Sequence, residues 1–600
     1  MYFTTRKFFI FIGLVFFFFS TGNSVEAQET TQIAKVSVVS KEESAEKEPA
    51  PKKEISAEMN RTFTRVGVDQ TQTEPLTLNE AIRRALENNN QIEVARDDVR
   101  YQETQLRSFL GFYDPVVNVT PNYTRNSTTG SEPTNDFRVN SNVTKSIRQT
   151  GGNYSVFFNN SRTENRFAQA QLSSGSTLGE SSTSAINSSN LGIQFNQPLL
   201  RNFRIDSQRR LIRIQRKRLQ QSDADFRRQT IEIISQVQRS YWDLVFALRD
   251  LQNRNANLNL SRENLRQIEA RIEAGASAPL ARAEVATELA NREADVLIAT
   301  QQVATAENSL KTLILRNPNA PEWNESLVPT DQPAFSMEPV DLNIALQEAV
   351  QNRTELRRLR LQKEINAIDI EYFRDQTKPQ IDLTGSISLN GLAQSGNQNG
   401  VLLVPQFTGN DEILRQRLNT LLPLDQQIPA RDIPIPPPPS YLVGGYNQAL
   451  RNILRTDAPN YTVGVTFSFP IGNQTARANL AGARFLQEQN NAQLRSQEQN
   501  VIAEVRNAVQ AVETARQRVL TARRAIENAE IQLEGERRLF EVGRSTNFLL
   551  FQRENTLANA RNSLIRAETD YNKALADLQR ATSTTFRVNN IEVESPTDNQ

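Results

Sequence analysis

Two stretches of the chain carry an apolar residue at every seventh position over six successive repeats, and this pattern constrains the fold more than any other feature. A strict seven-residue period corresponds to about 3.5 residues per turn, which is typical of helices that supercoil with one seam facing a partner. Residues 209–274 alone predict a rod of about 100 Å at about 1.5 Å per residue. The predicted coiled-coil seam consists of Val237, Leu244, Leu251, Leu258, Leu265, Ile272, Val505, Val512, Val519, Ile526, Leu533 and Phe540.

The two halves of the chain repeat each other. Every residue of the second seam follows its counterpart in the first at one constant offset, as Val505 follows Val237, and the next helices keep this offset between Leu289 and Leu557. The openings of the two copies, residues 76–81 and 340–345, are related by a slightly smaller offset. We therefore predict a mainly α fold with a β part, built from a duplicated unit of helix, strands, long helix and helix.

The segments outside the repeats have a different composition. A basic start, a short apolar run and the small-residue site before residue 28 predict a signal peptide, and this run is too short to span a bilayer as a helix. The charged stretch that follows has few apolar residues, so we expect it to be disordered. The predicted division is 1–27 signal peptide, 28–75 disordered linker, 76–316 first repeat, 317–339 linker, 340–582 second repeat with a Pro-rich surface loop at 391–460, and 583–600 tail.

The composition excludes several classes of function. The chain has no histidine and no cysteine, which removes the commonest general base, the commonest metal ligand, disulfides and thiolate nucleophiles. A formal net charge of +1 gives no electrostatic basis for binding nucleic acid. The sequence also has no phosphate-binding or dinucleotide-binding glycine motif. We therefore expect no enzyme activity, no metal site and no cofactor.

Strands with strict alternation of apolar and polar residues are predicted between the helices of each repeat. The clearest are 381–390 and 461–469, and shorter ones lie at 117–120 and 191–196. Their length suits a tilted membrane strand with one face toward lipid and one toward a wet lumen, and closure with other copies would leave no unpaired edge. Whether residues 138–161 add a further hairpin is left open by the sequence. The predicted barrel strand ends are Pro115, Pro198, Pro379 and Pro470.

Each seam stops at a glycine that begins a short segment of small and polar residues. A glycine here fits a left-handed helix C-terminus, and a following serine or threonine can cap the next helix. We expect these two segments to be the exposed tips of helical hairpins. The tip residues are Gly275, Ala276, Ser277, Ala278 and Pro279 in the first copy, and Gly543, Arg544, Ser545, Thr546, Asn547 and Phe548 in the second.

Over about residues 76–582 the chain resembles the TolC-type outer-membrane efflux proteins. The resemblance rests on the duplication, the LTLNEAI opening at residues 76–82, the strand that ends at residues 197–200, and the two tips. The most specific segment is residues 543–552, which is similar to a GxSTNFxVLQ pattern of that family.

The resemblance implies a homotrimer whose strands close one 12-stranded barrel in the outer membrane of a Gram-negative cell. The helices would continue the barrel as a periplasmic tunnel, and the tips would dock a periplasmic adaptor protein that links the tunnel to a proton-driven or ATP-driven inner-membrane pump. Outer-membrane lipid is then a further partner, and the chain itself is a passive exit duct for efflux or type I secretion.

One feature departs from the family pattern. Many members carry carboxylates just past the tip glycine, but here the matching stretches, residues 280–282 and 549–551, have none. Glu269, Glu273 and Glu541 lie on the other limb of each hairpin instead.

Two alternatives to the duct remain. A structural coiled-coil protein of the periplasm or cell surface would share the seven-residue period. A carboxylate-based hydrolase would need acidic residues gathered in a cleft, whereas here they lie three or four residues from arginines along helices, as expected of helix-surface pairs. The cargo is not specified by the sequence.

Overall fold

A computed structural model describes residue 65 and residues 67–127, 129, 133–164, 185–275, 278–394, 402–407, 409–435 and 439–592. All of these belong to one compact unit, Phe63–Gln600. The predicted signal peptide lies outside the described residues. Among the described helices, none is both long and apolar enough to cross a bilayer.

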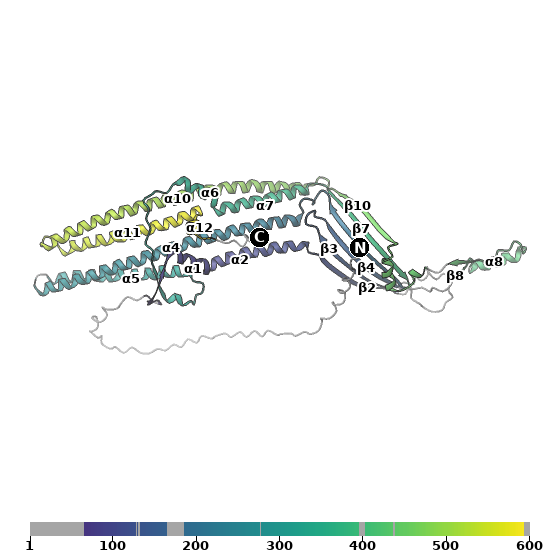
Figure 1. Cartoon of the computed structure of the whole chain (residues 1–600), viewed down its shortest axis with the longest axis horizontal. Helices are drawn as coiled ribbons and strands as arrows, with labels where there is room; N and C mark the ends of the chain where they lie inside the picture. The colour runs from purple at the N-terminus through teal and green to yellow at the C-terminus, as the bar shows by residue number, and fades with distance from the viewer. Residues whose placement is uncertain are drawn as a thin grey trace, which may run out of the picture. The chain divides into compact units, whose positions relative to one another are not determined.

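Six antiparallel strands form the main sheet, in the order β10-β7-β5-β4-β3-β2 (Figure 1). The predicted strands are all present and longer than expected, and residues 138–161 supply two more strands, β3 and β4, joined by a tight turn in which Gly151 has a φ of 73°. The strands are β2 (Val116–Asn126), β3 (Thr134–Ser146), β4 (Asn153–Glu164), β5 (Ala185–Pro198), β7 (Gln380–Gln394) and β10 (Pro459–Ser468).

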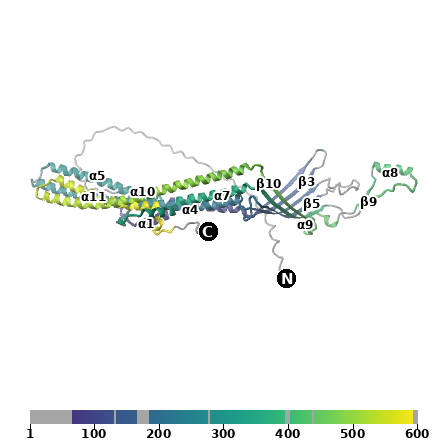
Figure 2. The same cartoon turned by 90° about the horizontal axis from the view of Figure 1, so that it is seen from above.

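Two long helical hairpins carry the seven-residue pattern. In the first, α4 (Ser207–Glu273) packs against α5 (Leu280–Ile314), and in the second, α10 (Gln474–Glu541) packs against α11 (Asn547–Thr582). Both views show the two hairpins ending on the same side (Figures 1 and 2).

A pair of shorter helices opens each repeat, where the sequence predicts one. Helices α1 (Leu78–Asn88) and α2 (Asn90–Leu110) pack on α4, and α6 (Leu342–Asn352) and α7 (Thr354–Gln376) pack on α10. The break in the first pair is at Asn89, which accepts hydrogen bonds from the backbone N–H groups of Gln91 and Ile92 and so starts a new helix.

The expected disorder up to Pro75 is wrong for residues 69–75. Strand β1 (Asp69–Leu76) pairs in parallel with β6 (Glu325–Pro329), which lies in the predicted inter-repeat linker after the short helix η3 (Pro321–Asn324). This segment has few apolar side chains. It is nevertheless ordered, because its backbone forms ladder hydrogen bonds with a segment far away in the sequence.

The largest core cluster lies where this small sheet meets α1, α2, α4 and α5. Tyr241 and Leu244 of α4 are fully buried in it, and the Tyr241 hydroxyl donates to Asp331 Oδ2 at 2.8 Å. Burial raises the pKa of the Tyr241 phenol. The centre of the long helix is therefore anchored both to the start of the first repeat and to the linker between the repeats.

The Pro-rich loop and the tail hold more structure than predicted. Residues 391–460 include the end of β7, the pair β8 (Leu402–Pro405) and β9 (Asp432–Ile435), helix α8 (Asn410–Leu421), the short helix η4 (Ser440–Leu442) and helix α9 (Tyr446–Ile453). Helix α9 packs on β7 at Gly391. A side chain does not fit there, because an added Cβ would lie 2.0 Å from the carbonyl oxygen of Ala449 on α9. The tail begins with the short helix α12 (Thr585–Val588).

Candidate functional site

One face of the six-stranded sheet is apolar from edge to edge. The ladder register puts one apolar residue of each strand in a single row across the sheet: Val117, Val143, Val156, Ile193, Ile387 and Tyr461. Each of these side chains is between 38% and 70% exposed in the single chain. A continuous exposed apolar surface of this extent marks contact with lipid or with another protein.

The opposite face of the sheet is polar. The row that contains Thr120 continues as Asn140, Asn159, Asn190 and Asn390, with a hydrogen bond from Asn190 Nδ2 to Asn390 Oδ1. One aromatic ring, Phe157, lies over Gly192, where an added Cβ would come within 2.6 Å of the ring. One apolar face and one polar face are the pattern of a sheet between lipid and an aqueous lumen.

The four predicted strand ends lie near the ends of strands. Pro115 and Pro379 directly precede β2 and β7, Pro198 is the last residue of β5, and Pro470 follows β10 by two residues. Because neighbouring strands are antiparallel, all four fall at the same end of the sheet, where the chain enters or leaves the helices. Two aromatic residues of the apolar face, Tyr123 of β2 and Phe467 of β10, are 61% and 67% exposed.

The seam residues face the interior of the two hairpins. Val237, Leu244, Val505 and Val519 are fully buried, and the remaining eight are buried or half-buried. Within the first hairpin Leu258 packs with Leu289 and Val296 of α5. The partner of each seam is therefore the returning helix of the same repeat together with its neighbours.

The first tip ends α4 in the expected left-handed turn. Gly275 has a φ of +71°, and its N–H donates to the Ile272 carbonyl at 2.9 Å. Ala276 and Ser277 lie outside the described residues, so the predicted serine cap is not described. Ala278 and Pro279 are exposed, and Pro279 precedes α5 without a side-chain cap.

The second tip has the complete hydrogen-bond pattern of a glycine C-cap. Gly543 has a φ of +72°; its N–H donates to the Phe540 carbonyl at 3.1 Å, and the Arg544 N–H donates to the Leu539 carbonyl at 2.9 Å. Thr546 caps α11 through its hydroxyl, which accepts from the Leu549 N–H at 3.4 Å. Ser545 takes a different role from the predicted cap, because its hydroxyl bonds to the Glu536 carboxylate of α10.

The tips also present apolar side chains that the sequence analysis did not single out together. Leu280 and Phe548 occupy the same position in the two repeats and are 70% and 71% exposed. The offset that relates the two seams is the signal that could have paired them. Arg544 and Thr546 are exposed beside Phe548, and Asn547 begins α11.

Contacts between the two hairpins extend from the Lys573–Asp243 pair to the neighbourhood of the tips. The guanidinium of Arg271 on α4 lies 5.2 Å from the ring centre of Phe540 on α10. Deeper in, burial raises the pKa of Glu554 on α11, although the cations of Arg537 and Arg292 and a hydrogen bond from Asn264 oppose the shift. Glu554 is therefore a charge that the packing of the two hairpins holds partly out of water.

The acidic residues named from the sequence do not gather at one point of the described chain. Glu269 pairs with Arg282 across the first hairpin at 3.1 Å, while Glu273 and Glu541 are exposed. Among the residues that the structure describes, no group of three or more acidic residues could hold a metal ion.

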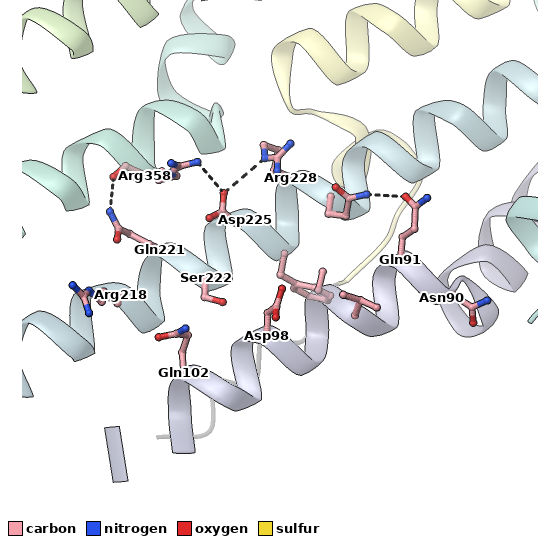
Figure 3. A pocket seen from close by; sticks show the side chains of 14 residues that line it. Asn90, Gln91, Asp98, Gln102, Arg218, Gln221, Ser222, Asp225, Arg228 and Arg358 are labelled. Carbon is pink, nitrogen blue, oxygen red and sulfur yellow. Dashed lines mark hydrogen bonds and ion pairs between the residues drawn. The ribbon is translucent and has the colours of Figure 1, made fainter. Parts of the chain in front are cut away.

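A polar pocket of about 860 Å³ lies between α2, α4 and α7 (Figure 3). Asp225 of α4 lies there between Arg228 and Arg358, at 3.8 Å and 3.7 Å, and Gln221 donates to the Arg358 carbonyl at 3.2 Å. The carboxylate pairs with a guanidinium group of its own helix and with one of α7, so it links α4 to α7, which is a structural arrangement rather than a catalytic one.

The sequence pattern of the outer membrane efflux protein family matches residues 81–314 and 440–584, more than half of the chain. The chain belongs to the outer membrane efflux protein family. It is therefore an outer-membrane efflux channel, and its family consists of ducts rather than enzymes. The structural coiled-coil alternative and the hydrolase alternative are not retained.

Solved structures share the fold of this family member at low sequence identity. A membrane protein from Pseudomonas aeruginosa is 17% identical, with a TM-score of 0.54 and coverage of 84% of this chain and 92% of that chain. The Campylobacter jejuni CmeC outer membrane channel is 14% identical (TM-score 0.52; 86% and 90%), and the open Neisseria gonorrhoeae MtrE outer membrane channel is 15% identical (TM-score 0.52; 84% and 88%). A comparison with curated proteins gives no match.

Proposed function

We propose that this efflux channel is the exit duct of a tripartite efflux or type I secretion system. Three copies close one barrel in the outer membrane, and their helical hairpins extend through the periplasm toward an adaptor and an inner-membrane pump. The observation that carries the proposal is the combination, in one chain, of a sheet with an exposed apolar face and two long hairpins that end in exposed tips.

The tips support an adaptor-docking role through their shape and chemistry. Each ends a rod whose length at about 1.5 Å per residue is about 100 Å. Each also presents a large, exposed apolar side chain at the same position of the repeat, Leu280 or Phe548. Exposed aromatic and aliphatic anchors of this kind contribute much of the binding energy at protein interfaces. The channel has no energy source of its own in this proposal, so transport depends on the pump.

Charge placed on the tip anchors tests the docking role. Phe548→Glu together with Leu280→Glu should lower export at least tenfold, because two apolar contacts with the adaptor would be replaced by carboxylates. Leu421→Glu on α8 is the matched control, since Leu421 is 82% exposed and distant in sequence from both tips. Native mass analysis checks that all variants keep the same assembly.

Two outcomes would contradict the proposal. Wild-type export by the double tip variant would remove the docking role of the tips. A detergent-extracted protein that is monomeric by native mass analysis would remove the duct of three copies.

A further inference from the structure

The sheet has two open edges that fit each other. Strands β2 and β10, of 11 and 10 residues, each pair with only one neighbour in the described chain. Because adjacent strands are antiparallel and the sheet has six strands, β2 and β10 run in opposite directions. The β2 edge of one copy can therefore extend the antiparallel sheet at the β10 edge of the next copy.

The β3–β4 hairpin lies inside this sheet. It pairs over its whole length with β2 on one side and with β5 on the other. Its apolar side chains are on the same face as those of the other strands: Phe137, Val143 and Val156 are 49%, 38% and 40% exposed. A hairpin in water would hide these side chains, whereas a hairpin in the membrane wall would turn them toward lipid.

The apolar band also crosses the hairpin at the slope of a membrane barrel. Val117 of β2 and Tyr461 of β10 lie in the same row. On β2 the apolar residues of this face run from Val117 to Tyr123, away from the helices. On β10 they run from Tyr461 to Phe467, toward the helices. The band thus shifts by about 20 Å along the strands while crossing about 24 Å of sheet, a tilt of about 40°. Strands of membrane barrels tilt by about 35–45°.

We propose that the β3–β4 hairpin is part of the membrane wall, so that each copy contributes six strands and the channel closes as an 18-stranded barrel through β2–β10 seams. The number of three copies rests on the proposed function. Four strands per copy, as the 12-stranded barrel of the family resemblance would require, leaves no place for the hairpin.

The added strands change the width of the exit. At a strand spacing of about 4.8 Å and a tilt of about 40°, 18 strands enclose a backbone diameter of about 36 Å, against about 24 Å for 12 strands. The face turned to this lumen carries mainly amide and hydroxyl groups, such as Asn140, Asn159 and Asn390. Such a barrel has room for bulky polar cargo.

Paired cysteines test the position of the hairpin, because the native chain has no cysteine. Val156→Cys with Ile193→Cys should form a disulfide within one chain, since β4 and β5 are neighbours and place these residues opposite each other. Val119→Cys with Leu191→Cys should not, because two strands separate them and three strand spacings of about 4.8 Å exceed the reach of a disulfide. The reverse result would place β2 against β5 and overturn the proposal.

A separate pair tests the seam between copies. Continuing the band with the same slope places Val465 of β10 opposite Val119 or Pro121 of β2 in the next copy. Val465→Cys with Val119→Cys or with Pro121→Cys should therefore give a disulfide between copies, and Val465→Cys with Thr120→Cys should not, because Thr120 faces the lumen. No disulfide between copies in either pair would contradict ring closure, and with it the proposed function, whatever the hairpin does.

A deletion gives the strand count directly. Arg125 of β2 lies in the same row as Ala185 of β5, through Asn135 and Glu164 of the hairpin, so a short Asn-Gly turn can replace residues 126–184. Electron cryomicroscopy in lipid nanodiscs should show 18 strands for the full chain and 12 for the deletion variant. Twelve strands in the full chain would overturn the proposal, even when the assembly has three copies.

Discussion

At the scale of single residues, a buried ion cluster joins the first hairpin to the linker between the repeats. The side chains of Glu307 and Lys311 on α5 are 0% and 1% exposed and lie 3.2 Å apart. Lys311 donates to the Trp323 carbonyl at 2.8 Å, and Glu307 accepts from the Leu327 N–H at 2.8 Å and pairs with Arg65. Two cations thus flank one carboxylate, so each charge has an opposite charge beside it, which is the condition under which buried charges are tolerated.

Removing the lysine from this cluster should destabilise the protein. Lys311→Met leaves Arg65 as the charged partner of Glu307 but takes the donor away from the Trp323 carbonyl, so we expect a loss of about 1–3 kcal/mol, measured as a lower Tm of the detergent-extracted protein. Arg100→Met is the control, because its pair with Asp97 is exposed and such pairs contribute about 0–1 kcal/mol. The double variant Lys311→Met, Glu307→Met should lose more stability than Lys311→Met alone, because it leaves the Arg65 guanidinium without its carboxylate. An unchanged Tm in Lys311→Met would contradict this account.

Glu554 predicts a pH-dependent effect between the two hairpins. Burial raises its pKa, so its contribution to stability is fully present below the ordinary pKa of a glutamate and is lost as the pH rises through the raised value. Glu554→Gln should therefore raise the Tm at pH 7 and have no effect at pH 4. Glu263→Gln, at an exposed site on α4, should not change the Tm at either pH. A lower Tm for Glu554→Gln at pH 7 would show that the contacts with Arg537 and Arg292 outweigh burial.

At the scale of elements, each long helix needs a residue that can end it in a left-handed turn. Gly543 does this at a φ of +72°, after which two hydrogen bonds close the last turn of α10. Side chains with a Cβ are sterically disfavoured in this region, whereas a glycine inside a helix is itself unfavourable. Substitution of glycine by alanine should therefore have opposite effects on stability at the tip glycine and at a glycine inside α10.

Gly543→Ala and Gly535→Ala form this pair. We expect Gly543→Ala to destabilise the tip by about 1 kcal/mol, and Gly535→Ala, where an added Cβ meets open space, to stabilise α10 by about 0.5–1 kcal/mol. Hydrogen–deuterium exchange of the backbone amides around residues 536–550 measures both. Faster exchange in Gly535→Ala, or unchanged exchange in Gly543→Ala, would contradict the assignment of the tip geometry.

At the scale of the whole molecule, the apolar face of the sheet decides where the protein resides. A surface on which Val117, Ile387 and Phe467 are 65%, 49% and 67% exposed is stable only when lipid or detergent covers it. The full-length protein should therefore appear in the outer-membrane fraction of a Gram-negative cell and leave it only with detergent. A variant that combines Val117→Asn, Ile387→Asn and Phe467→Asn should lower the fraction of the protein that inserts into the outer membrane. Recovery of the unmodified protein in the soluble periplasmic fraction would contradict the outer-membrane assignment.

The sequence alone determined the helical hairpins, their duplication and their glycine tips. This information is local: a seven-residue period such as Val505, Val512 and Val519 acts within one helix and its returning partner, and a glycine at 543 limits its own backbone. Strict alternation likewise indicated the strands from residues 381 and 461, because the two faces of a strand are read directly from its sequence.

Only the tertiary structure decided which distant segments pair. The polar stretch from Asp69 is a strand because β6, beyond the whole first repeat in the chain, offers it a ladder, and no local pattern carries that information. The β3–β4 hairpin belongs to the main sheet because β2 and β5 lie on either side of it and align Val143 and Val156 with the apolar row. Burial of charges such as Lys311 is equally a property of the assembled core, because the sequence does not distinguish a buried lysine from an exposed one.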